Sequence, residues 1–177
     1  MRLLWVVPAL VAFAAVAACQ PEESVAGAAS PETQPAREPV FSDRTKQADY
    51  DHAVAAVADV RRALAGGLDP RATTELGFRC ASLRTQEKGL ATESDPLVGR
   101  VIADIEKTCG LDVPLASARV EIAQIERKRA EDGHASIRGE CLGLKLAIGD
   151  VGAPYASNPD VADVGGKFAQ YCGDASP

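Results

Sequence analysis

Residues 95–110 read DPLVGRVIADIEKTCG, a stretch that contains signals for the start, body and end of one helix. Asp95 and Pro96 are residue types preferred at the N-cap and at the first helical position. Large apolar residues then recur at helical spacing as far as Cys109. We expect this helix to be closed by Gly110, because glycine commonly follows the last turn of a helix. Runs of alternating β-branched residues are absent from the sequence, which therefore predicts an all-α fold.

The same signals divide the rest of the chain from residue 44 onward into helices. We expect these over about residues 44–65, 70–89, 112–133, 136–148 and 159–173. The apolar stripes of all these helices predict a core made of Tyr50, Val54, Val57, Val60, Leu64, Leu76, Cys80, Leu83, Leu97, Val101, Ile102, Ile105, Cys109, Leu115, Ala118, Ile122, Ile125, Ile137, Cys141, Leu144, Ile148, Val161, Val164, Phe168, Tyr171 and Cys172. The predicted fold is a disulfide-stapled bundle of about five to six helices.

Two blocks of the sequence carry the same features in the same order. Residues 80–84 and 141–145 both read Cys-x-x-Leu-basic, and an Asp-Pro or Asn-Pro pair follows each block. Each series then ends with Cys-Gly, and both of these cysteines lie 13 residues after their proline. This order favours a duplicated three-helix unit, with repeats over 44–110 and 112–173. The alternative is that helical hairpins reuse the same capping residues by chance.

The first residues of the chain have a different character. Arg2 precedes an apolar run that covers residues 3–18, is interrupted by Pro8, and is shorter than the roughly 20 residues of a membrane-spanning helix. Small residues then lead to Cys19, which is the layout of an export signal. The sequence Val-Ala-Ala-Cys at 16–19 resembles the lipobox of bacterial lipoproteins. The alternative is an ordinary signal peptide that leaves Cys19 as a free thiol.

The resemblance implies that residues 1–18 are cleaved and that Cys19 carries a covalent diacylglycerol and an N-acyl lipid. The bilayer would then be a partner through Cys19, and no other cofactor is expected. Gln20 stands where inner-membrane lipoproteins of the enteric type carry Asp, which implies the outer membrane, on its periplasmic side. Residues 19–43 are rich in Pro, Glu and Ala, so we expect a disordered tether before a helical domain over 44–177.

An exported chain with four further cysteines is expected to pair them as disulfides. Cys80, Cys109, Cys141 and Cys172 allow three connectivities. In each repeat one cysteine precedes the hairpin loop by about two helical turns and the other follows it by nearly four, so their heights differ by roughly 6–9 Å. We expect uneven entry of the two arms into the loop to absorb this difference. The repeat therefore favours pairing Cys80 with Cys109 and Cys141 with Cys172.

The remaining composition restricts the chemistry. The net charge is −6, and the basic run at 127–129 is flanked by acidic residues, so a nucleic-acid partner is not expected. The closest of the four later cysteines are 29 residues apart, which argues against a redox Cys-x-x-Cys motif or a zinc site. We interpret His52 as half of a solvated pair with Asp49, His134 as a cap on helix carbonyls, and residues 126–132 as a charged helix face.

These observations favour a membrane-anchored lipoprotein of the cell envelope that acts as a non-enzymatic binding or support module. Its partner would be an envelope protein or a cell-wall component. One alternative is a periplasmic hydrolase whose carboxylates and His52 are brought together by the fold. Another is a helical bundle that encloses a small apolar ligand. The sequence assigns no catalytic residue and no metal ligand.

Overall fold

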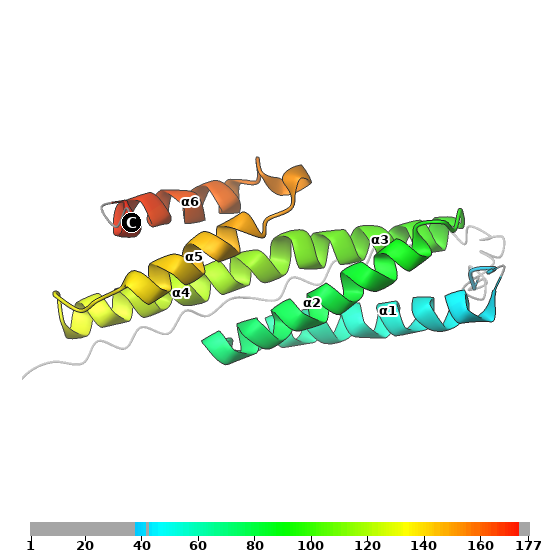
Figure 1. Ribbon diagram of the computed structural model, residues 1–177, viewed down its shortest axis with the longest axis horizontal. Helices are drawn as coiled ribbons and strands as arrows, with labels where there is room; N and C mark the ends of the chain where they lie inside the picture. Colours follow the sequence, from blue (N-terminus) through cyan, green and yellow to red (C-terminus); the bar gives the residue numbers. More distant parts are fainter. Residues whose placement is uncertain (1–37, 42, 174–177) are drawn as a thin grey trace, which may run out of the picture. The chain divides into compact units, whose positions relative to one another are not determined.

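The structure, a computed structural model, describes residues 38–41 and 43–173. The predicted signal peptide, Cys19 and most of the predicted tether lie outside this part of the chain. The described residues form α-helices without any strand, so the all-α prediction is confirmed. The helices are α1 (Arg44–Leu64), α2 (Pro70–Leu90), α3 (Pro96–Lys107), α4 (Val113–Glu131), α5 (Arg138–Gly149) and α6 (Pro159–Cys172), with a π-helical turn η1 (Thr108–Asp112) and a short 3-10 helix η2 (Ala153–Tyr155) (Figure 1).

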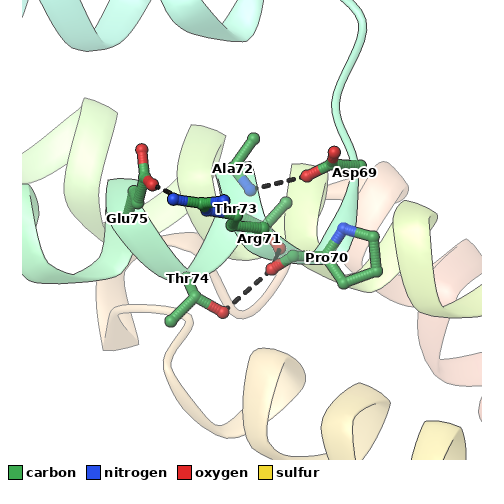
Figure 2. Close-up of polar contacts among 7 residues, drawn as sticks. All are labelled: Asp69, Pro70, Arg71, Ala72, Thr73, Thr74 and Glu75. Carbon is green, nitrogen blue, oxygen red and sulfur yellow. Dashed lines mark hydrogen bonds and ion pairs between the residues drawn. The ribbon is translucent and has the colours of Figure 1, made fainter.

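The predicted Asx-Pro starts are N-caps in the structure. The Asp69 carboxylate accepts a hydrogen bond from the backbone N–H of Ala72 at 2.7 Å at the start of α2, as Figure 2 shows. Asp95 accepts from the N–H of the second residue of α3 at 2.8 Å. Asn158 accepts from the equivalent N–H of α6, also at 2.8 Å. Since the first N–H groups of a helix have no partner inside it, each cap satisfies one of them.

The helix predicted to end at Gly110 does not end there. α3 runs into η1 and η1 runs into α4, so the chain continues along one nearly straight path in Figure 1. Pro114 has no backbone N–H and therefore cannot donate to Gly110 four residues earlier. The freed Gly110 carbonyl accepts a hydrogen bond from the N–H of Gly152 at 2.8 Å instead. The predicted helix stop and start are thus the two sides of a π-helical turn.

The buried apolar residues form two clusters that follow the two expected halves. The first cluster lies mainly among α1, α2 and α3, includes Leu83, Leu90 and Ile105, and reaches Val113 at the start of α4. The second lies among α4, α5 and α6 and includes Ile125 and Leu144. Because η1 contributes Cys109 to the first cluster and Leu111 to the second, it is the point where the two cores meet.

The two disulfides join Cys80 to Cys109 and Cys141 to Cys172, which are the pairs that the repeat favoured. The first bridge fastens α2 to η1, and the second fastens α5 to the last residue of α6. All four cysteines are buried. Each bridge therefore closes one helical hairpin within its own core.

The stripe predicted for the first helix is wrong at one position. Val54 is 42% exposed, whereas Ala53 is fully buried together with Val57 and Val60. Ala53, Val57 and Val60 have the same helical spacing as the predicted set but include a smaller side chain. Since α1 packs against both α2 and α3, the methyl group of Ala53 suits the close approach of these helices.

The packed body begins before residue 44. The ring of Phe41 lies 5.4 Å from the ring of Tyr50, centre to centre, and Phe41 packs against the first core. The N–H of Val40 approaches a carboxylate oxygen of Asp95 at 3.5 Å. The end of the predicted tether is therefore held against α1 and the start of α3.

Candidate functional site

A groove lies over α4, with α2 on one side and α5 on the other. α4 packs against both of these helices, so it forms the floor between them. The groove has a volume of about 560 Å³. Its lining residues are Thr73, Thr74, Gly77, Phe78, Cys80, Ala81, Arg84, Cys109, Val113, Pro114, Ser117, Glu121, Gly143, Leu146, Ala147 and Asp150.

The lining follows from helical periodicity. On α2 the residues recur at intervals of three or four from Thr73 to Arg84, and α4 and α5 show the same spacing. At 1.5 Å per residue this stretch of α2 is about 16 Å long, or three turns. Small residues such as Gly77, Ala81 and Ser117 leave the space between the larger side chains open.

Two large apolar side chains border this groove and are exposed. Phe78 of α2 is 74% exposed, and Leu146 of α5 is 61% exposed. Leu142, one turn before Leu146 on α5, is 58% exposed. Isolated exposed apolar residues are ordinary, but here two of them lie on opposite sides of one groove.

A carboxylate is held against the backbone of α5. A Cβ atom placed on Gly143 would lie 2.8 Å from the carboxylate of Glu121, so only a glycine leaves room for this arrangement. Gln124 donates a hydrogen bond from Nε2 to Glu121 at 3.3 Å. Burial raises the pKa of Glu121 above its ordinary value, and the negative charge of Glu140 raises it further. The groove thus contains a partly desolvated acid.

The end of the groove near η1 includes the Cys80–Cys109 disulfide and a backbone carbonyl that is held by a side chain of α2. The π-helical turn directs the N–H of Val113 to the carbonyl of Thr108, which leaves the Cys109 carbonyl without its ordinary helical donor. The Arg84 guanidinium donates to this carbonyl at 2.9 Å. Arg84 therefore ties α2 to η1 beside the Cys80–Cys109 bridge. The Cys141–Cys172 bridge belongs to the second core and does not line the groove.

The two histidines lie elsewhere. His52 on α1 is exposed, and its Nδ1 lies 2.6 Å from Nε2 of Gln86, so its observed partner is an amide of α2 and not the predicted Asp49. His134 contributes its backbone N–H to the Asp132 carboxylate at 3.0 Å, and within the described residues its imidazole caps no carbonyl. Neither histidine lines the groove. Among residues 38–41 and 43–173, three or more metal-binding side chains do not gather at any point.

The charged run at 126–132 is more than a solvated face. Lys128 pairs with Glu140 of α5 at 2.6 Å, and this contact lowers the pKa of Glu140. The guanidinium of Arg129 lies 5.2 Å from the ring centre of Tyr171 and donates to the Tyr171 carbonyl at 3.1 Å. The Tyr171 hydroxyl in turn donates to Glu126 at 2.9 Å. These charges fasten α4 to α5 and α6.

The sequence interpretation did not identify the groove. Phe78 lies off the buried stripe of α2, and a large aromatic residue on the polar face of a predicted helix was the available signal. The sequence contained no signal for the contact between Glu121 and Gly143, because that contact depends on how α4 packs against α5.

None of the described helices combines the length and apolarity needed to cross a bilayer. No protein-family model, curated protein or solved structure matches this chain.

Proposed function

We propose that the protein is a lipid-anchored component of the bacterial cell envelope whose helical domain binds another envelope protein through the groove over α4. The lipobox-like residues 16–19 support the anchor, and Gln20 supports an outer-membrane position facing the periplasm. The role is binding or support without catalysis. Lipid on Cys19 would keep the domain near the membrane, and the groove would select the partner.

The exposure of Phe78 and Leu146 on the two sides of the groove is the observation that carries the binding proposal. Covering the exposed part of such side chains with a partner contributes at most about 1.5–3 kcal/mol for each one, before the costs of association. Exposed anchors of this kind, in particular aromatic ones, dominate the energetics of protein interfaces. The hydrolase alternative has less support, because the groove contains Glu121 and Asp150 but neither histidine.

The anchor is tested by the substitution Cys19→Ala in the full chain. We expect the variant to move from the membrane fraction to the soluble fraction, because it lacks the acylated thiol. The native product should have the mass of the chain that begins at Cys19 plus the lipid groups. Membrane residence of the variant, or an unmodified amino end in the native product, would refute the anchor.

The binding site is tested by photocrosslinking in intact cells. A photoreactive residue at Phe78 or Leu146 should capture the same protein. The matched control is Arg62 on α1, whose side chain is 77% exposed and lies outside the groove. Equal capture from position 62, or no capture from either groove position, would contradict the proposal.

A further inference from the structure

The charges in the groove are unbalanced. Glu121 and Asp150 contribute two carboxylates, and Arg84 is the basic residue of the lining. Arg84 uses its guanidinium to donate to the Cys109 carbonyl. Within the described part of the chain, no lysine or arginine forms an ion pair with Glu121, whose hydrogen-bond partner is the neutral amide of Gln124. The groove therefore presents an acid that lacks a cationic partner.

This acid lies against the backbone of α5. Gly143 leaves room for the Glu121 carboxylate against the α5 backbone. The carboxylate is partly removed from water there, and that desolvation raises its pKa. A cation placed beside a desolvated carboxylate interacts with it more strongly than with a fully hydrated one. The site thus favours an occupant that carries positive charge.

The shape of the groove suits a helix. Three helices line it with residues three or four positions apart, over about three turns of α2. The small side chains of Gly77, Ala81 and Ser117 let another backbone approach closely. Rows of side chains at this spacing are the surfaces into which a further helix packs. Phe78 and Leu146 would then contact the apolar stripe of that helix from its two sides.

We propose that the occupant of the groove is an amphipathic helix of the partner protein, with an apolar stripe against Phe78 and Leu146 and a lysine or arginine that pairs with Glu121. This inference rests on the proposed function and specifies the chemistry of the partner. The apolar contacts supply most of the affinity, and the ion pair selects basic helices over neutral or acidic ones.

The test uses the folded protein and three synthetic helical peptides of about 18 residues, a length at which isolated helices begin to be stable. The peptides share one leucine and alanine stripe and differ at a single position beside it, which is Lys, Gln or Glu. Binding is measured by fluorescence anisotropy against the native chain, Glu121→Gln, Phe78→Ser and the control Glu131→Gln, an exposed glutamate at the end of α4. Circular dichroism and a thiol assay verify that each variant is folded with both disulfides intact.

We expect the native protein to bind the Lys peptide about tenfold more tightly than the Gln peptide. The Glu121→Gln variant should lose this preference, Glu131→Gln should retain it, and Phe78→Ser should bind all three peptides more weakly. A preference for Lys that persists in Glu121→Gln would overturn the inference, as would the absence of binding to any peptide. Equal binding of the three peptides that depends on Phe78 would refute the basic partner and leave the binding groove standing. The photocrosslinking experiment fails separately if the groove contacts no protein in cells.

Discussion

Removal of the second disulfide should destabilise the protein and detach its last helix. The double substitution Cys141→Ala with Cys172→Ala opens a loop with a sequence separation of 31 residues. The chain-entropy relation then gives a loss of about 3.6 kcal/mol in the free energy of unfolding. α6 has 14 residues, and only two of them, Val164 and Cys172, are buried, so we expect it to depend strongly on its bridge. Isolated helices of this length are marginal in water.

The assays are urea unfolding and amide hydrogen exchange. The matched control removes the first bridge by substituting Cys80 and Cys109, whose separation of 29 residues predicts nearly the same global loss. Both double variants should lose about 3.6 kcal/mol in the free energy of unfolding. Only the variant that lacks Cys141 and Cys172 should lose exchange protection in α6. A loss below about 1 kcal/mol, unchanged protection of α6, or four free thiols in the native protein would refute the reasoning.

Three further predictions follow from single side chains. Gly165 and Gly166 lie inside α6 with open space around a Cβ atom, so alanine at each should raise the free energy of unfolding by about 0.5–1 kcal/mol, measured by urea unfolding. Arg84→Met should cost about 1–3 kcal/mol in the same assay, because it leaves a carbonyl of η1 without its donor. The raised pKa of Glu121 means that ionisation of this carboxyl opposes folding at neutral pH. The Glu121→Gln variant should therefore be more stable than the native chain at pH 7, and this gain should disappear as the pH falls below 4.5, the ordinary pKa of a glutamate. The control Glu131→Gln should show no such pH dependence.

Local signals were sufficient for much of the fold. The Asp-Pro and Asn-Pro pairs predicted the starts of α2, α3 and α6 because an N-cap depends only on the next few residues. The cysteine pairing was also accessible, since each bridge joins the arms of one hairpin. These features need no knowledge of how distant helices pack.

The features that were not predicted depend on distant residues. Gly110 reads as a helix stop, but the chain continues because Gly152 and Arg84 supply donors to the carbonyls that the π-helical turn releases. Ala53 takes the place of Val54 in the core because the covered face of α1 depends on where α2 and α3 lie. The groove requires the joint placement of α2, α4 and α5. Sequence periodicity describes one helix at a time, so it could not reveal a surface made by three.

The π-helical turn has a consequence for the dimensions of the groove. Phe78 stands on a helix of the first core and Leu146 on a helix of the second, so the two walls belong to different halves of the molecule. The backbone that passes from one half to the other along α3 and α4 does so through η1. The helical geometry of η1 therefore contributes to the separation of the two apolar anchors. Inserting or deleting one residue in that turn would therefore change the distance between Phe78 and Leu146.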